Sequence, residues 1–489
     1  MNLLTDTWIP VQQDGKQQLI RLQDVLCKED DWQLSLPRDD MEMACLQLII
    51  CLTQVIFLPA DAKELKQRIK QPLNEAEYWS GIAKYTDWFD LNHPETPFMQ
   101  VRGVKAEKTT PIQKLFVGLP EGNNHCFFND PGELTAVSQS AAAIALFNQA
   151  MNSPSIGGGF KGGFRGNAPI TTLISGDTLR QTVWFNVMQE DTLRLILPQY
   201  DSMKENDKPV WVESIKAKSS IAANSIGLLR GLFWQPAYFE LEFTNSGICQ
   251  IYGTNEKVLV AGFKKEKFVY EVIGQWVHPH SPRYWRMNKG EKEQKYASFT
   301  TTAPAWTQLS RFVIEQETEK EGQQPATIIS QFRSMMRNTP LVLMVGGYRN
   351  KQASILQRRH ELITLSIGWD ESLKALNSFI ESAMQVKAAL RNKLYGFAKS
   401  SGAGGLPAEA EAIFYNRSEP LIHSCLRHMD WREAVQEKAC LVQELIQLAW
   451  DIFTQILKPY QHEPKMIHAI AIARRTMGKE FRKIKGEQV

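Results

Sequence analysis

The chain contains no Cys-x-x-Cys pair, although seven cysteines are scattered over its 489 residues. An odd, dispersed set of cysteines gives neither a zinc knuckle nor a disulfide framework, so we expect reduced thiols and a cytoplasmic location. The N-terminus also lacks a basic segment followed by an apolar one, so no signal peptide is visible. The most apolar run, Met43–Leu58, is shorter than the ~20 residues that cross a bilayer. It predicts a buried helix and no membrane association.

Neither sign of charge dominates the composition. The 56 Lys and Arg residues nearly balance the 53 Asp and Glu residues, which gives a net charge of +3. Because the overall field is weak, a surface for nucleic acid has to be local. Signature motifs of serine hydrolases, zinc proteases and P-loop NTPases are missing as well. We therefore predict no catalytic residue, no bound metal and no cofactor.

The best acidic cluster is Asp39, Asp40 and Glu42. Carboxylates are favoured in the first turn of a helix, where they interact with the helix dipole, and the apolar run that follows predicts such a helix. The same carboxylates could instead hold a metal ion in a nuclease. The helix explanation is the simpler one, and a metal-dependent nuclease is kept as the alternative function.

The most informative segment that is present is rich in glycine and spans Ser155–Gly166. Half of its residues are Gly, its only charges are Lys161 and Arg165, and no Asp or Glu occurs between Glu133 and Asp177. Glycine lets backbone N–H groups approach an anion closely, and unopposed cations reinforce them. The segment predicts a phosphate-rich partner. The alternative is a flexible surface loop, and the spacing G-x-G-x-x-G here lacks the βαβ context of a dinucleotide site.

Two other segments combine glycine with cations. In Gly262–Phe268, alternation along a strand puts Lys265 and Lys267 on one face, either to contact a groove or as ordinary edge-strand lysines. Gly346–Ser354 predicts an exposed turn before a helix. A long polar side chain at the tip of that turn could alternatively be inserted between base pairs.

The fold class we predict is α+β, with a large mixed α/β N-terminal domain at residues 1–365 and a C-terminal four-helix bundle at 366–489. In the second part, apolar residues recur at three- and four-residue steps, which indicates amphipathic helices. Its last segment, Lys458–Val489, is basic, which is typical of a solvated face or of a surface facing a polyanion. In the first part we expect one Ala-rich helix, 136–152, and strands at 171–174, 183–187 and 268–272.

Several strings, collinear along the chain, resemble the CasA family, the large subunit of the type I-E CRISPR surveillance complex Cascade. They are Met1-Asn-Leu-Leu, Trp8-Ile-Pro, Leu36-Pro-Arg-Asp-Asp-Met-Glu, Ala145-Leu-Phe-Asn-Gln-Ala, Gly157-Gly-Gly-Phe-Lys, Arg230-Gly-Leu-Phe-Trp-Gln-Pro-Ala, His278-Pro-His-Ser-Pro and Gly346-Gly-Tyr-Arg-Asn-Lys-Gln-Ala-Ser-Ile-Leu.

The resemblance implies a non-enzymatic DNA reader. Such a subunit recognises the protospacer-adjacent motif in double-stranded target DNA through the minor groove, helps to start unwinding for R-loop formation, and recruits a helicase-nuclease. Its expected partners are target DNA, the 5′ handle of the CRISPR RNA, the other Cascade subunits and the helicase-nuclease. Guide pairing carries the sequence information in this kind of complex, so the protein checks only a short motif.

Position by position, the resemblance also assigns residues. The glycine loop at the motif corresponds to Ser155, Gly157, Gly158 and Gly159, with Ser155 where the family has glycine. The minor-groove lysine corresponds to Lys267. The remaining assignments are a strand wedge at Lys351, Gln352 and Ala353, and an RNA-handle and subunit loop at Phe127, Phe128 and Asn129. We further expect Lys161, Arg165 and Lys289 to contact the DNA backbone. Of a cysteine cluster found in some family members only Cys249 is kept, so no zinc is expected.

Overall fold

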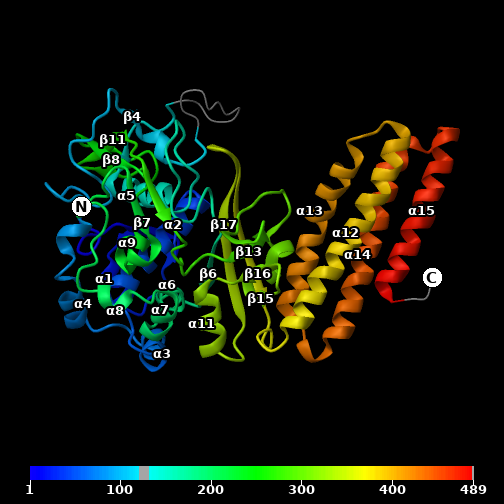
Figure 1. The fold of residues 1–489 in the computed structure, drawn as a ribbon, viewed down its shortest axis with the longest axis horizontal. Helices are drawn as coiled ribbons and strands as arrows, with labels where there is room; N and C mark the ends of the chain where they lie inside the picture. Colours follow the sequence, from blue (N-terminus) through cyan, green and yellow to red (C-terminus); the bar gives the residue numbers. More distant parts are fainter. Residues whose placement is uncertain (120–131, 487–489) are drawn as a thin grey trace. The chain divides into compact units, whose positions relative to one another are not determined.

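The computed structural model describes residues 1–119 and 132–486. The chain divides into two compact units (Figure 1). The first comprises residues 1–300, 316–335 and 344–360, and the second comprises 301–315, 336–343 and 361–489. We keep 1–365 and 366–489 as proposed domain limits, and note that the second unit also takes in two short segments from before residue 365. No helix in the described part of the chain is both long and apolar enough to cross a membrane.

The core of the first unit is built on helix α2 (Asp39–Ile56), which begins at Asp39 and is buried along most of its length. This confirms the buried helix expected at Met43–Leu58 and explains the acidic residues in its first turn. Helix α5 (Gln139–Met151) packs against α2, and Ser138 caps it by accepting a hydrogen bond from the Ala141 N–H at 3.2 Å. The Ala-rich pattern therefore gives the expected helix, which ends just before the glycine-rich segment.

A four-stranded sheet lies beside these helices in the first unit. Its strand β11 (Leu259–Glu266) pairs antiparallel with β8 (Tyr238–Thr244), β4 (Thr110–Pro111) and β5 (Val137–Ser138). Lys267 is the first residue after β11. Strand β12 (Tyr270–Ile273) follows and pairs in parallel with β7 (Ser219–Ala222). Lys264 and Lys265 thus lie near the end of β11, and Lys267 follows it directly.

Two hairpins complete the part of the fold that matters for the site. β13 (Arg283–Asn288) and β14 (Glu291–Tyr296) are joined by a turn in which Lys289 and Gly290 have φ of 52° and 86°. β17 (Leu341–Lys351) and β18 (Ser354–Leu365) form a longer hairpin, which pairs with β6 (Thr171–Ser175). At Gly346, β17 passes so close to α2 that a Cβ would collide with Met43.

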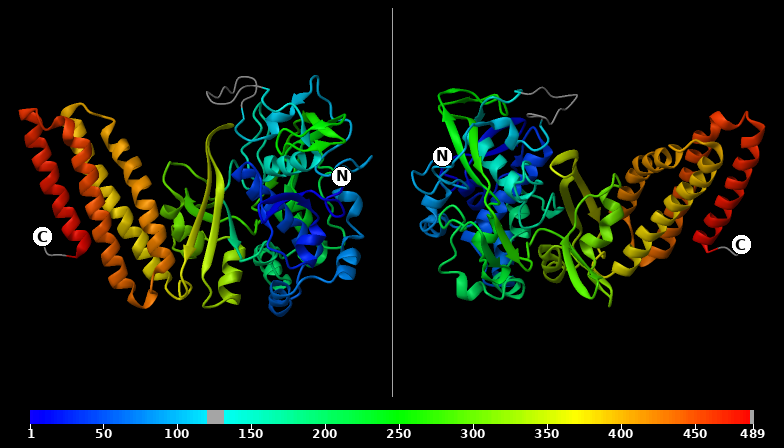
Figure 2. Two further views of the ribbon diagram at one scale, coloured as in Figure 1. Left: turned by 180° about the vertical axis from the view of Figure 1, so that it is seen from behind. Right: turned by 45° about the horizontal axis from the view of Figure 1, so that its top comes forward.

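The second unit carries a bundle of helices that lie side by side in Figures 1 and 2. They are α12 (Leu373–Ser401), α13 (Leu406–His428), α14 (Ala434–Leu457) and α15 (Pro464–Lys485). Buried apolar residues recur on their inner faces, as on α14, where Leu441, Leu445, Leu448 and Ile452 are buried. The α+β class and the C-terminal helical bundle are confirmed.

Shorter elements fill the remaining parts of the two units. The helices are α1 (Leu22–Cys27), α3 (Ala62–Lys70), α4 (Glu75–Ile82), α6 (Leu179–Phe185), α7 (Glu190–Ile196), α8 (Tyr200–Met203), α9 (Leu228–Leu232), α10 (Leu309–Val313) and α11 (Thr327–Met335). The strands are β1 (Ile9–Gln13), β2 (Lys16–Ile20), β3 (Gln33–Leu34), β9 (Gly247–Ile248), β10 (Asn255–Glu256), β15 (Gln316–Glu317) and β16 (Glu321–Gln324).

Two local predictions are wrong. The strand expected at 183–187 is the end of helix α6, whose N-terminus is capped by Thr178. Val183 and Trp184 are fully buried, so the β-branched and aromatic residues reflect burial and not an extended backbone. The turn expected at Gly346 before a helix is also wrong, because residues 346–351 continue strand β17 and another strand follows.

Candidate nucleic-acid interface

The glycine-rich segment forms a tight, exposed turn. The Phe160 N–H donates to the Gly157 carbonyl at 3.1 Å, with Gly158 and Gly159 at the two central positions. Gly157, Gly158 and Gly159 have φ of 90°, 59° and 79°. Three successive residues in the left-handed region would be costly for any residue with a Cβ, so the backbone path depends on glycine. Ser155 precedes the turn and is half-buried.

Arg165 anchors the base of this segment inside the protein. Its side chain is 4% exposed and donates to Thr171 Oγ1, Ser281 Oγ, the Met151 carbonyl and Asn152 Oδ1 at 2.6–2.9 Å. Burial lowers the pKa of the guanidinium to about 10. The expected contact of Arg165 with the DNA backbone is therefore revised, because the guanidinium is turned inward to fix the loop.

Lys267 meets the glycine turn from the end of β11. Its Nζ lies 3.4 Å from the Gly158 carbonyl oxygen, and a Cβ built on Gly159 would lie 3.6 Å from the same Nζ. Lys267 is exposed, so its ammonium group is presented to solvent together with the turn. The lysine and the exposed backbone thus form one surface.

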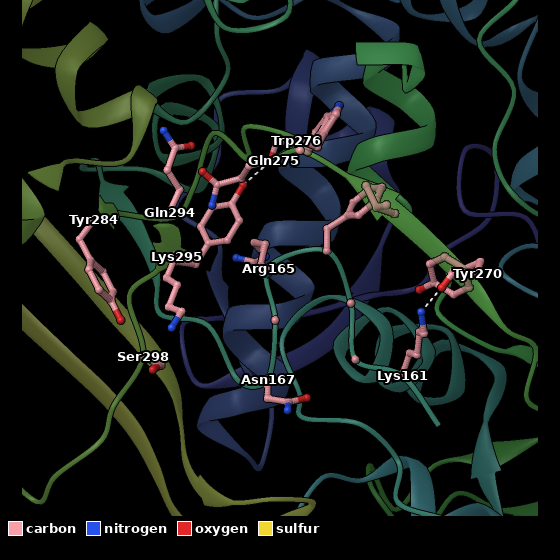
Figure 3. Close-up of a pocket in the computed structure, with 17 residues that line it drawn as sticks. Lys161, Arg165, Asn167, Tyr270, Gln275, Trp276, Tyr284, Gln294, Lys295 and Ser298 are labelled. Atoms are coloured by element: carbon pink, nitrogen blue, oxygen red, sulfur yellow. Dashed lines mark hydrogen bonds between the residues drawn. The ribbon is translucent and has the colours of Figure 1, made fainter. Parts of the chain in front are cut away.

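Lys161 has a different environment from Lys267. Its Nζ donates to the Tyr270 carbonyl and lies 4.6 Å from the centroid of the Tyr270 ring (Figure 3). Holding a cation over an aromatic face is favourable and restricts the side chain. The ammonium group of Lys161 lies near the turn, but a phosphate would have to compete with Tyr270 for it.

The tip of the β17–β18 hairpin also reaches the glycine turn. Gln352 and Ala353 form the turn of the hairpin, and a Cβ on Gly157 would lie 3.7 Å from the Ala353 Cβ. Gln352 is exposed with φ of 54°, and its carbonyl accepts a hydrogen bond from Asn350 Nδ2 at 2.5 Å. The proposed wedge residues Lys351, Gln352 and Ala353 are thus neighbours of the proposed motif-reading residues.

Packing behind the hairpin fixes this approach. Tyr348 on β17 is buried against Ala168, which follows the glycine segment, and against Val117 and Ile355. The Tyr348 hydroxyl donates to Asp40 Oδ2 at 2.8 Å and accepts from Asn148 Nδ2 at 2.8 Å. Because Asn148 lies on α5, the helix that leads into the glycine segment, one buried hydroxyl links the hairpin to the loop.

The acidic cluster at the start of α2 is committed to this packing. Asp40 pairs with Arg38 at 2.7 Å, and Arg358 lies 3.4 Å from both Asp39 and Asp40. Burial acts to raise the pKa of Asp40, but the hydrogen bonds from Arg38 and Tyr348 and the charge of Arg358 outweigh it and lower the pKa. Carboxylates neutralised by two guanidinium groups are poorly suited to hold a metal ion. The alternative of a nuclease at Asp39, Asp40 and Glu42 is not supported.

Other predicted residues lie apart from the turn or outside the described residues. Lys289 is exposed in the β13–β14 turn, and its contact with the DNA backbone stays a prediction. Phe127, Phe128 and Asn129 lie outside the described residues. Cys249 is buried, and its Sγ accepts a hydrogen bond from the Ser138 N–H at 3.1 Å. Within residues 1–119 and 132–486, the group of potential metal ligands that comes together is Glu361, Glu419 and His423, far along the chain from Cys249.

Tyr270, which positions Lys161, and Tyr348, which positions the hairpin, were not predicted from the sequence. A single tyrosine in a strand is ordinary, so no local pattern could have identified either one. The aromatic residues around the glycine segment were more accessible to prediction, since Phe164 interrupts the glycines and Trp276 opens a Trp- and Pro-rich run. Phe164 stacks on Trp234 at 3.9 Å between ring centroids.

Comparisons with known proteins bear on the family and the fold of this chain. Residues 2–452 match the family model of the CRISPR-associated protein Cse1. A curated relative, CRISPR-associated protein CasA/Cse1 of Thermus thermophilus, is 24% identical over 222 residues, which are 43% of this chain and 41% of that protein. The aligned region thus spans less than half of the relative.

Solved structures show the same fold over the whole chain. Thermobifida fusca Cse1 superposes with a TM-score of 0.79 at 18% identity, covering 99% of this chain and 98% of that one. A chain of a structure described as a CRISPR RNA-guided surveillance complex superposes with a TM-score of 0.67 at 14% identity, covering 98% and 99%. From the family match over most of its length, the chain belongs to the Cse1 family of CRISPR-associated proteins.

Proposed function

We propose that this chain is the non-enzymatic large subunit of a CRISPR RNA-guided surveillance complex, and that it reads the protospacer-adjacent motif of target DNA from the minor groove. The observation that carries the proposal is the convergence of three elements that are distant in sequence. Lys267 and the Gln352–Ala353 tip both approach the glycine turn: Lys267 Nζ lies 3.4 Å from the Gly158 oxygen, and a Cβ built on Gly157 would lie 3.7 Å from the Ala353 Cβ.

The chemistry of these groups suits a minor groove. A groove of that width admits a backbone ribbon without side chains, and the glycines supply one that is exposed at Gly158 and Gly159. An ammonium group can reach the acceptors at the floor of the groove, where A·T and T·A pairs look alike. A reader of this kind therefore accepts a small set of related motifs, and pairing with the guide provides the remaining specificity.

Strand separation would begin at the hairpin tip. Gln352 projects from a two-residue turn beside the reading surface, and its positive φ of 54° is held by a hairpin that is packed at Tyr348. A side chain inserted between base steps unstacks them at a cost of a few kcal/mol, which its contacts must offset. We assign this wedge to Gln352, flanked by Lys351 and Ala353.

The partners follow from the same proposal. They are double-stranded target DNA, the 5′ handle of the CRISPR RNA, the other subunits of the complex in the cytoplasm, and a helicase-nuclease that arrives after the R-loop has formed. The relatives solved as CRISPR RNA-guided surveillance complexes support the assembly part of the proposal.

The test compares Lys267, which directly follows strand β11, with a lysine inside that strand. Lys267→Ala in the reconstituted complex should weaken binding to duplexes that carry the motif by about tenfold, or about 1.4 kcal/mol. Lys264→Ala is the control, since Lys264 lies three residues earlier and pairs with Glu242 at 3.8 Å. Its removal should change affinity by less than about twofold, because exposed ion pairs contribute little. Equal affinity of the parent complex for duplexes with and without the motif would refute the proposed function.

A further inference from the structure

A cavity of about 500 Å³ lies in the first unit immediately beside the reading surface (Figure 3). Three stretches of the chain form it: residues 161–167 of the glycine segment, residues 270–276 of β12 and the loop that follows, and residues 284–298 of the β13–β14 hairpin. Its volume falls within the range of about 300–1,000 Å³ that is typical of sites for small ligands. A single nucleotide is a ligand of this class.

One wall of the cavity is aromatic, because Phe164, Tyr270 and Trp276 line it. Phe164 stacks on the buried Trp234 at 3.9 Å and lies 5.8 Å from Trp276 at an interplanar angle of 20°. The Tyr270 ring is tilted by 59° against Trp234, whose Nε1 donates to the Tyr270 hydroxyl at 3.2 Å. Tyr284 stands on the opposite side of the cavity from Tyr270 in Figure 3. Such aromatic surfaces are what unstacked bases bind, with little dependence on base identity.

The charged residues that line the cavity are all cationic. They are Lys161, Arg165 and Lys295, and no carboxylate is among the lining residues. Lys295 is half exposed, and its Nζ pairs with the Glu293 carboxylate at 2.7 Å. A phosphate group would replace Glu293 as the partner of Lys295. The surroundings of the cavity therefore favour an anionic ligand with an aromatic part.

Two residues that line the cavity each have one buried polar atom without a hydrogen-bond partner among the described residues. These atoms are Nε of Arg165, a donor, and Oε1 of Gln275, an acceptor. Buried polar groups are normally paired. An unpaired donor and an unpaired acceptor at one cavity therefore indicate a ligand that carries both a hydrogen-bond acceptor and a hydrogen-bond donor. The edge of a nucleobase carries both kinds of group.

We infer that this cavity accepts one unstacked nucleotide of the DNA strand displaced at the wedge. The inference rests on the proposed function and on position: Lys161 is two residues from Gly159 in the turn, and Tyr270 is three residues from Lys267. A DNA strand that leaves the duplex at the glycine turn and Lys267 would therefore reach this cavity first. Capture of one nucleotide keeps the opened duplex from closing again while guide pairing starts.

The experiment uses the assembled complex and target duplexes with 5-iododeoxyuridine at single positions of the displaced strand near the motif. Irradiation links the base to an adjacent aromatic residue, and mass spectrometry identifies the peptide. We expect one position to crosslink to the peptide containing Tyr270, Trp276 or Tyr284. Lys295→Gln should lower the yield at least about fivefold, because it removes a phosphate contact.

The matched control is Lys292→Gln. Lys292 lies on the same strand, β14, and also pairs with a glutamate, Glu317 at 3.3 Å, but it does not line the cavity. Its crosslink yield should equal that of the parent. Equal yields from both variants, or crosslinks that never map to the cavity while binding stays motif-dependent, would overturn the inference and leave the proposed function intact. Saturable binding of free dTMP without displaced-strand crosslinks would also overturn it. Loss of motif dependence in the parent complex would instead refute the proposed function.

Discussion

The proposed reading surface, formed by Gly157–Gly159 and Lys267, would depend on a backbone without side chains, and Gly158→Ala tests that dependence directly. Gly158 has φ of 59°, and within 4 Å an added Cβ would meet only the Phe160 ring, at 3.9 Å. The methyl group therefore fits in the protein itself. The left-handed conformation costs an alanine about 1–2 kcal/mol, which sets the loss in the free energy of unfolding. Any loss of DNA affinity that is larger than this cost has to come from a clash between the added methyl group and the DNA.

A matched substitution separates strain from contact. Gly15 lies in the turn between β1 and β2 with φ of 74°, and a Cβ there would meet nothing within 4 Å. Gly15→Ala carries the same conformational cost at a position away from the reading surface. Gly158→Asn adds a third point, because Asn tolerates the left-handed region better than Ala does and yet has a larger side chain.

Urea unfolding and binding to motif-bearing duplexes provide the two measurements. Both alanine variants should lose similar stability, whereas only Gly158→Ala should lose about tenfold or more in affinity. Gly158→Asn should recover stability and bind as weakly as Gly158→Ala. If Gly158→Ala binds within about twofold of Gly15→Ala, the main chain at Gly158 does not enter a groove, and the reasoning fails.

Three further outcomes are expected. Gln352→Ala leaves the backbone strain at φ of 54° in place but removes the proposed wedge, so it should slow strand opening as measured by 2-aminopurine fluorescence. Gln357→Ala on the same hairpin should not slow it, and equal opening rates for the two variants would refute the wedge role of Gln352. Arg165→Met should lower the free energy of unfolding by about 3 kcal/mol or more because it removes four buried hydrogen bonds, and the exposed control Arg286→Met by less than about 0.5 kcal/mol. Burial raises the pKa of Asp207 from 3.8 to about 6, so the folded chain binds this proton more tightly than the unfolded chain. This contribution, on the order of 3 kcal/mol, is complete below about pH 4 and lost as the pH rises through about 6, and Asp207→Asn should abolish the slope seen in unfolding titrations.

The sequence by itself determined features that depend on near neighbours along the chain. Periodic apolar residues after 366 specified amphipathic helices, and α12, α13, α14 and α15 lie in that part of the chain. The glycines at 157–159 specified a backbone that only glycine adopts readily, and all three have positive φ. The collinear strings carried the family resemblance, and the family match over residues 2–452 confirms it.

Only the tertiary structure decided where the charged and aromatic groups face. Arg165 and Lys267 are both cations in segments that contain glycine, yet Arg165 is 4% exposed and bonded to Thr171 and Ser281, whereas Lys267 is exposed to solvent. The sequence analysis assigned Gly346 to a turn, but Gly346 lies in strand β17, where the missing side chain leaves room for Met43, some three hundred residues earlier. Burial and contact depend on residues far apart in the chain, and no local pattern encodes them.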